Sequence, residues 1–226
     1  MDFSIVIDKL PNLFRGAFIT LKYSVISLIL GCIIGVCIAL MRDYKVSKKV
    51  SGVLKATFAA ILRSIAWFYI WIIRGTPLMV QLFIIYFGLP QFGITLTPFA
   101  AGILGLTLNN GSFIAEIVRS GIHGVDKGER EAARALGMSY HLEMLRIVAP
   151  QASKLIMLPM VNHFISTIKN SSILSVITIA ELTREGQVMA NSSFNYFPVY
   201  VSVAVLYLML TSLCMLSAAY LERRLS

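Results

Sequence analysis

Two basic side chains, Arg74 and Lys169, lie within stretches of the sequence that are otherwise strongly apolar. An ionisable group at the depth of a lipid bilayer is costly, which makes it a candidate for function. Gly75 and Pro77 follow Arg74 and predict a broken helix, whose free backbone groups are tolerated only against protein or a water-lined cavity. The Arg74 guanidinium is able to pair there with a ligand's carboxylate. Alternatively, it caps backbone carbonyls or pairs with an acid of another helix.

Lys169 opens a polar cluster that continues with Asn170, Ser171 and Ser172. Asn110, in a different apolar stretch, is also polar enough to line a cavity. Such side chains either border a path for a polar ligand or form hydrogen bonds between helices, as Ser and Asn do in membranes. The residue types leave both interpretations open.

No motif in the sequence supports enzymatic catalysis. The three histidines, His123, His141 and His163, lack the spacing of metal ligands. No GxxxxGK[ST] phosphate-binding loop is present, so we expect that the chain does not hydrolyse ATP by itself. The three cysteines form no CxxC pair and are interpreted as small apolar side chains.

The composition indicates the elements that must position these residues. The chain has 226 residues, of which 57% are hydrophobic and 14% charged, whereas soluble domains carry about a quarter charged residues. A helix needs about 20 apolar residues to span a bilayer. We therefore expect one all-α, polytopic membrane domain over residues 1–226, and the N-terminus lacks a cleavable signal pattern. The five predicted spans are residues 17–41, 59–87, 99–118, 155–179 and 198–221.

The net charge of +9 reflects topology. Nucleic-acid binding is not expected, because no basic stripe with interleaved aromatic residues is present. Basic residues favour the cytoplasmic side in short loops, which places the N-terminus outside and the loop 119–154 and the C-terminus inside. Three basic residues fall on the outer side: Lys9, Arg15 and Arg184. Fourteen fall on the inner side: Arg42, Lys45, Lys48, Lys49, Lys55, Arg63, Arg119, Lys127, Arg130, Arg134, Arg146, Lys154, Arg223 and Arg224.

The loop 119–154 contains a charged, alanine-rich segment, GEREAARALGMSYHLEMLRIVAPQ. Strong helix formers predict a short helix ended by Gly137, which adopts a positive φ readily. Ser139 is a predicted N-cap of a second helix, which Pro150 is expected to end.

Ala132, Ala133 and Leu136 would give the first helix of this segment a small apolar patch. Helices shorter than about 12 residues are marginal in water, so this one needs a surface to dock against. A partner protein suits the small patch and its charged rim better than lipid. The simpler alternative is a solvated loop whose charges only follow the topology.

Several motifs add a resemblance to a known family. The pattern Glu131-Ala132-Ala133, Gly137, Ile147 and Ala149-Pro150 resembles the EAA loop of ABC importer permeases, with Ala149 in place of the usual leucine. RGTPLMVQLFIIYFGLP and IKNSSILSVITIAEL are similar to the polar amino-acid branch, the histidine/glutamine type. The likeness extends over about residues 14–221.

The resemblance implies a permease subunit in the bacterial cytoplasmic (inner) membrane, with no cofactor of its own. A cytoplasmic ABC ATPase would bind ATP, a second permease subunit (identical or homologous) would complete the path, and an extracytoplasmic binding protein would deliver an amino acid. The expected ATPase-docking residues are Gly128, Glu131, Ala132, Ala133, Leu136 and Gly137. The expected substrate path includes Arg74, Asn110, Lys169, Asn170, Ser171 and Ser172.

After the lysine that matches Lys169, members of the family usually carry Asp where this chain has Asn170. The missing carboxylate removes one partner for a cationic substrate, so the substrate is expected to be neutral or acidic. Two other functions remain open from the residues alone. One is a channel or secondary transporter that is not driven by ATP, with the charged loop as its gate, although no internal repeat of 20–50 residues is evident. The other is a membrane scaffold without a transport role.

Overall fold

The computed structural model describes residues 3–43 and 53–225, with side chains up to residue 219. This part of the chain is helical and contains no strand. It holds five helical segments long and apolar enough to cross a membrane, which agrees with the all-α polytopic fold that the composition predicts. The basic residues Lys45, Lys48 and Lys49, used above for orientation, lie outside the described residues. The long helices are α2 (Leu10–Arg42), α3 (Val53–Gly75), α5 (Pro98–Gly124), α8 (Ala149–Asn170) and α10 (Tyr196–Leu225).

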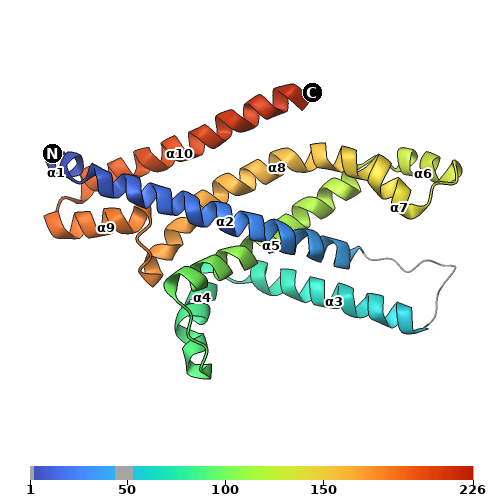
Figure 1. Ribbon diagram of the computed structural model, residues 1–226, viewed down its shortest axis with the longest axis horizontal. Coiled ribbons are helices and arrows are strands. Elements are labelled where there is room, and N and C mark those ends of the chain that lie inside the picture. The colour runs from blue at the N-terminus through green and yellow to red at the C-terminus, as the bar shows by residue number, and fades with distance from the viewer. Residues whose placement is uncertain (1–2, 44–52, 226) are drawn as a thin grey trace.

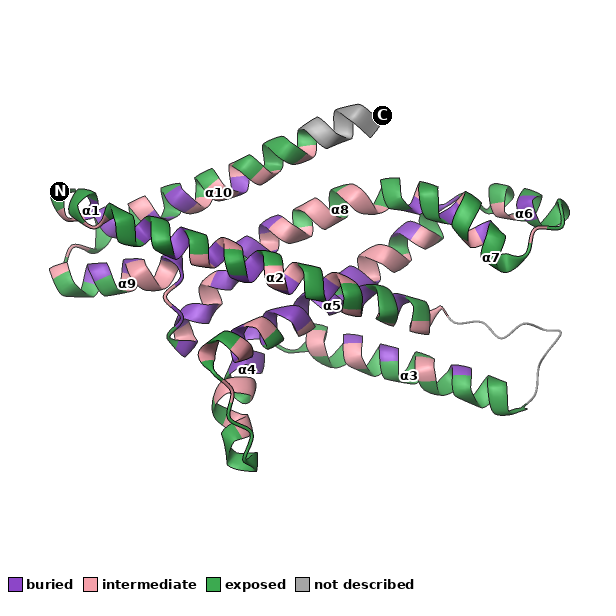
Figure 2. Ribbon diagram, viewed as in Figure 1, coloured by how far each residue is buried: buried purple, intermediate pink, exposed green. Residues whose placement is uncertain are grey.

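Helix α5 forms the centre of the bundle, with α2, α3 and α8 packed around it. Figure 2 shows the most continuous buried surface along α5, whereas α3 and α10 are largely exposed. Glycines bring α2 very close to α5: a Cβ added to Gly31 would lie 2.7 Å from the Asn110 Cβ, and one added to Gly35 would lie 2.7 Å from the Ile114 Cβ. The two backbones therefore approach as closely as small residues permit in membranes.

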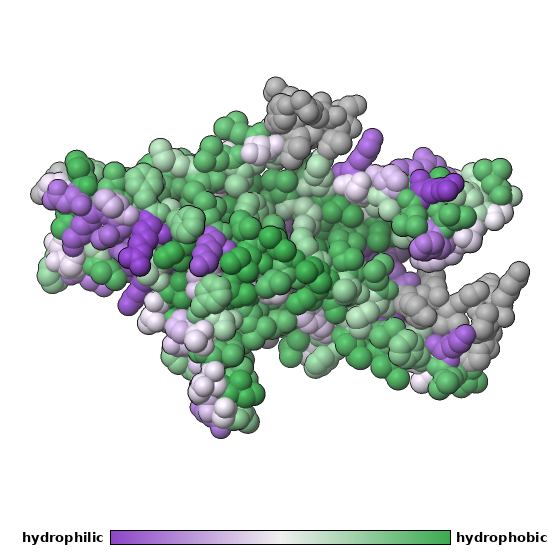
Figure 3. Space-filling view, viewed as in Figure 1, coloured by the Kyte–Doolittle hydropathy of each residue, from purple (hydrophilic) through white to green (hydrophobic). Residues whose placement is uncertain are grey.

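Apolar surface covers most of the middle of the molecule (Figure 3), and hydrophilic side chains gather towards its two ends. One end carries α1 (Ser4–Asp8) and α9 (Leu182–Ser193), as Figure 1 shows. The opposite end carries α6 (Lys127–Ala135) and α7 (Tyr140–Glu143). This distribution is typical of a bundle whose middle faces lipid or partner subunits.

The predicted second span is divided into two parts. Helix α3 ends at Gly75, and Pro77 has the extended ψ of 138°. The Gln81 side chain supports the break by donating hydrogen bonds to the carbonyls of Ile73 and Thr76, at 2.7 and 3.0 Å. The chain then turns away from the bundle (Figure 1), so residues 59–87 are not one continuous crossing. The segment beyond the break comprises α4 (Leu78–Phe83), the π-helical turn η2 (Ile84–Gly88) and the 3-10 turn η3 (Leu89–Phe92).

Pro150 does not end the helix after Ser139, contrary to the sequence-based expectation. Helix α7 continues through a π-helical turn, η4 (Met144–Val148), into α8, where Pro150 lies in the first turn. A proline is tolerated in the first turn of a helix, and the wider π turn just before Pro150 shifts the hydrogen-bond register at this point. Tyr140–Ile177 is therefore one continuous helical element, which joins the second part of the loop to the fourth span and ends in the 3-10 turn η5 (Ser171–Ile177).

Candidate functional site

A cavity of about 460 Å³ lies between α3, α5 and α8. Its walls combine charged and apolar side chains. The Arg74 side chain lines this cavity and is 43% exposed. The break after α3 places Arg74 at that helix's last turn, free to reach towards α5. The lining includes Arg74, Phe113, Glu116, Ser120, Leu155 and Pro159.

Glu116 is the centre of a charged cluster beside this cavity. Its carboxylate pairs with Arg42 of α2, with Arg74 of α3 at 3.9 Å and with Arg119 of α5 at 3.4 Å. The pair with Arg119 joins two residues one turn apart on the same helix, whereas Arg42 and Arg74 are brought to Glu116 by other helices. The predicted alternative of Arg74 pairing with an acid of another helix is therefore observed. Three cations around one carboxylate leave an excess of positive charge at the cavity.

The aromatic rings of Phe113 and His163 stack beneath the Arg74 guanidinium and help to position it. Its guanidinium carbon lies 5.0 Å from the ring centroid of Phe113, a cation–π distance. The Phe113 ring in turn stacks on the ring of His163 from α8, with centroids 5.4 Å apart. The three side chains form a continuous stack that links α3, α5 and α8 at the cavity.

The other predicted path residues lie away from Arg74, and none of them lines its cavity. Lys169 and Asn170 are exposed at the end of α8, and Ser172 is partly buried. Ser171 is buried and donates a hydrogen bond to the carbonyl of Ile168 at 2.8 Å.

Asn110 is also buried, and other helices satisfy its amide. Its nitrogen donates to Ser27 of α2 at 3.1 Å, and its oxygen accepts from Thr167 of α8 at 2.9 Å. Asn110 therefore joins three helices. This contact is the interhelical hydrogen bonding that the residue types left open as an alternative to lining a path.

Helix α6 has a side-chain cap at its start, and it ends at Gly137 as its sequence predicts. The Asp126 side chain caps its first turn by accepting from the Gly128 N–H. Gly137 has a φ of +76°, and the Gly137 and Met138 N–H groups bond back to the carbonyls of Arg134 and Ala133, both near 3.0 Å. This is a Schellman ending, which favours glycine. Ser139 then caps α7, as expected, by accepting from the Leu142 N–H.

The predicted apolar patch of α6 is divided between two faces. Ala133 is buried against the rest of the hairpin, whereas Ala132 and Leu136 are exposed, Leu136 by 83%. At 100° per residue, Gly128 and Ala135 lie on the same face as Ala132 and Leu136. We name these four residues, Gly128, Ala132, Ala135 and Leu136, the outward face of α6.

Glu143 holds the opposite face of α6. Its carboxylate is only 1% exposed and accepts hydrogen bonds from Arg130 at 2.9 Å and from Arg134 at 2.8 and 3.0 Å. These bonds to Glu143 raise the pKa of Arg134. This cluster has no signature in the sequence, because spacings of 13 and 9 residues match no pattern within one helix.

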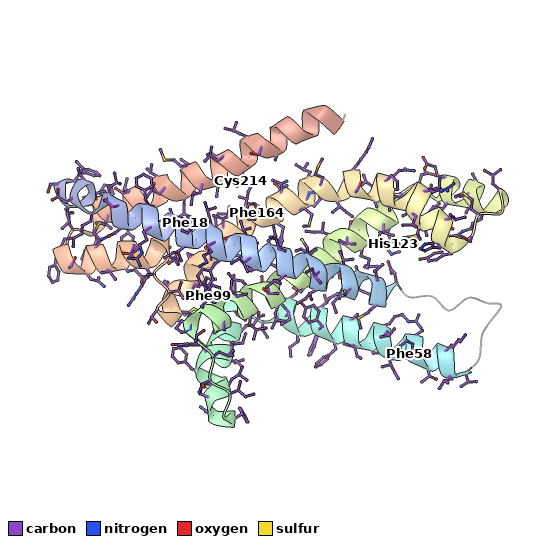
Figure 4. All side chains as sticks on the ribbon, in the orientation of Figure 1. Phe18, Phe58, Phe99, His123, Phe164 and Cys214 are labelled. Carbon is purple, nitrogen blue, oxygen red and sulfur yellow. The ribbon has the colours of Figure 1, made fainter. Side chains whose placement is uncertain are left out.

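A further side-chain contact joins two elements at the same end of the bundle. His123, at the end of α5 nearest α7 (Figure 4), lies 3.0 Å from the carboxylate of Asp43, which follows α2. This contact joins the end of α2 to the end of α5, next to the helical hairpin. None of the three histidines joins a cluster of metal-ligating side chains within the described residues.

A bundle of helices long and apolar enough to span a membrane, with a charged cavity and a projecting helical hairpin, identifies an integral membrane protein. The chain belongs to the family of binding-protein-dependent transport system inner membrane components, whose model matches residues 50–226. It is therefore a multi-pass inner-membrane permease of the ABC importer class and not the ATPase subunit. ATPase, substrate-binding and permease partners are implied by this family.

Curated relatives match along almost the whole chain. It is 37% identical to the probable glutamine ABC transporter permease protein GlnM of Bacillus subtilis (strain 168), over 100% of this chain and 98% of the relative. It is 36% identical to the arginine transport system permease protein ArtQ of the same organism, over 100% and 97%. A putative glutamine transport system permease protein GlnP of Rickettsia bellii (strain RML369-C) is 40% identical over 96% and 94%.

Solved structures share the fold. A chain from the crystal structure of an amino acid ABC transporter with histidines superposes with a TM-score of 0.90 at 36% identity, covering 99% of both chains. A chain of the inward-facing MetNI methionine ABC transporter has a TM-score of 0.78 at 21% identity, over 97% of this chain and 98% of that one. The second similarity is one of fold alone.

Proposed function

We propose that this chain is the permease subunit of an ATP-driven importer of polar amino acids. The similarity to glutamine and arginine permeases supports the substrate class. A second permease subunit, identical or homologous, would complete the translocation path, and an extracytoplasmic binding protein would deliver the amino acid. ATP would be bound by the partner ATPase and not by this chain.

The pairing of Arg74 with Glu116 is the observation that carries the substrate proposal. An α-amino acid presents one carboxylate and one ammonium group, and these two side chains offer the opposite charges within 3.9 Å of each other. The adjacent cavity of about 460 Å³ falls within the ~300–1,000 Å³ typical of small-molecule sites. A bound amino acid would replace the Arg74–Glu116 ion pair with two others, in which its carboxylate pairs with Arg74 and its ammonium group pairs with Glu116.

The charge of the cluster supports a preference among amino acids. Arg42, Arg74 and Arg119 surround the single carboxylate of Glu116, so a cationic side chain would meet repulsion there. We propose neutral or acidic amino acids as substrates, in line with Asn170 at the position where the family usually carries Asp. Lys169, Asn170 and Ser172 would border the route further along α8, while Asn110 and Ser171 would hold that route's helices together.

The outward face of α6 is the proposed docking surface for the ATPase on the cytoplasmic side. Its residues are small, apart from Leu136, and permit close approach, while Glu131 stands exposed at the rim. Such a short helix gains stability from a partner's surface. Ala133 and Gly137, also expected at this site, would act by shaping the hairpin.

Reconstitution of the complete transporter in proteoliposomes tests the proposed function. We expect uptake of a neutral or acidic amino acid that requires ATP and the binding protein. Arg74→Gln should weaken uptake affinity by roughly tenfold to a hundredfold, because a bond to a charged group contributes about 1.5–3 kcal/mol. Lys55→Gln, an exposed cation on the same helix, is the control. Uptake that persists without ATP would instead identify a channel or secondary transporter.

A further inference from the structure

Glu143 fastens α6 to the start of the helix that becomes α8. One carboxylate oxygen accepts from Arg130 at 2.9 Å and from Arg134 at 3.0 Å, and the other accepts from Arg134 at 2.8 Å. Arg130 and Arg134 project from one face of α6, and the outward face lies on the other side of that helix. Glu143 therefore binds α6 from behind the proposed docking surface.

Other contacts reinforce this connection. The Gln151 side chain, in the first turn of α8, donates a hydrogen bond to Glu129 of α6. Ala133 is the buried residue of α6, and Val148 is fully buried in a small apolar cluster with Val125 and Ala152. Helix α6, helix α7 and the first turns of α8 thus form one packed unit, in which Glu143 supplies the charged centre.

We propose that Glu143 is a positioning residue for energy coupling, because its carboxylate makes α6 and the base of α8 move together. The inference rests on the proposed docking of the outward face of α6 to an ATPase. A force applied to that face then reaches α8 through the Arg130–Glu143–Arg134 cluster. Leu155 and Pro159 of α8 line the cavity that holds Arg74, so the force arrives at the wall of the proposed substrate site.

A buried carboxylate suits this task better than an apolar contact. Two guanidinium groups converge on it, and each bond has a defined direction, unlike apolar packing. A neutral side chain at residue 143 would leave the Arg130 side chain, which is 18% exposed, without its counter-charge. Loss of the acceptor in this partly buried cluster is unfavourable, which would favour a displacement of α6.

The test uses the complete transporter in proteoliposomes and measures amino acid imported per ATP hydrolysed. Glu143→Gln should still purify with the ATPase and hydrolyse ATP, but this ratio should fall by about tenfold, because the charged acceptor of both arginines is lost. Arg134→Gln, whose side chain is 57% exposed and tolerant of change, should lower the ratio in the same direction. Arg134→Lys should restore part of it, because the charge returns without the two-pronged geometry.

Arg146→Gln is the matched control, since Arg146 is exposed on η4 and should keep the wild-type ratio. Wild-type ratios in both Glu143→Gln and Arg134→Gln would overturn the proposal. Loss of ATPase co-purification in Glu143→Gln would also overturn it, because the residue would then serve docking. Failure of the proposed function has a different signature, namely no ATP-dependent uptake by the wild-type complex.

Discussion

The Glu181 carboxylate accepts a hydrogen bond of 2.9 Å from the Tyr207 hydroxyl, which joins the start of α9 to α10. Glu181 is fully buried and also accepts from the backbone N–H groups of Thr183 and Arg184, at 2.9 and 2.8 Å. Glu181 is therefore both the N-cap of α9 and a connection between helices.

Glu181→Ala should destabilise the permease by about 1–3 kcal/mol, because it leaves two N–H groups and a buried hydroxyl without their acceptor. Thermal unfolding of the detergent-solubilised complex measures the effect. Glu185→Ala, on the same helix and only partly buried, should change the melting temperature far less. Equal losses in the two variants would show that the capping bonds contribute little.

Stability should also depend on pH through the same residue. Burial raises the pKa of the Glu181 carboxyl, although hydrogen bonds from the Thr183 and Arg184 N–H groups act to lower it. The folded state then holds this proton more tightly than the unfolded state, so its stabilising contribution is present at low pH and is lost as pH rises through the folded pKa. In Glu181→Gln this dependence should disappear from melting curves recorded between acidic and neutral pH. An unchanged slope would assign the pH dependence to other groups.

Glu116→Gln should remove the partner proposed for the ammonium group of the substrate. We expect uptake affinity for a neutral amino acid to fall by roughly tenfold, the value of one bond to a charged group. Competition by an analogue that lacks the α-amino group should be almost unaffected, because that analogue never used Glu116. If both ligands lose affinity equally, Glu116 acts only by holding Arg42 and Arg74 in place.

Gly137→Val should uncouple ATP hydrolysis from uptake while the helices still insert. A Cβ at Gly137 would meet no atom within 4 Å, so the cost arises from the φ of +76° and amounts to about 1–2 kcal/mol or more for a β-branched side chain. Gly137→Asn is the control, since asparagine tolerates this conformation. Normal coupling in Gly137→Val, measured as import per ATP, would contradict this role of the turn.

Gly35→Ala should loosen the contact between α2 and α5. The new Cβ would lie 2.7 Å from the Ile114 Cβ and 3.0 Å from the Ala115 backbone nitrogen, and overpacking of this kind costs about 1–3 kcal/mol. A lowered melting temperature is expected. At Gly88 the nearest atom to a new Cβ is 3.8 Å away, so Gly88→Ala should be neutral.

Local features of the hairpin were predictable because nearby residues determine them. Gly137 ends α6 with a positive φ, and Ser139 caps α7, as sequence chemistry requires. The prediction that Pro150 ends a helix was wrong, because proline is also common in the first turn of a helix. The π turn before it has no clear sequence signature.

Contacts between distant segments were not predictable in the same way. Arg74 and Glu116 are 42 residues apart in the sequence. Nothing in either local sequence indicates that the break after α3 brings the Arg74 side chain to Glu116. Nothing in the local sequence marks Glu143 as buried, yet its side chain is 1% exposed and pairs with Arg130 and Arg134. Such clusters depend on how helices cross, which periodicity does not encode.

The position of Pro159 within α8 has a mechanical consequence. Proline has no N–H to donate to the carbonyl four residues earlier, that of Leu155, so this turn lacks one rung of the helical ladder and bends most easily. Leu155 and Pro159 both form the cavity wall. The most pliable turn of α8 therefore coincides with the wall facing Arg74, and a small swing of the helix base would change the width of the cavity with little strain elsewhere.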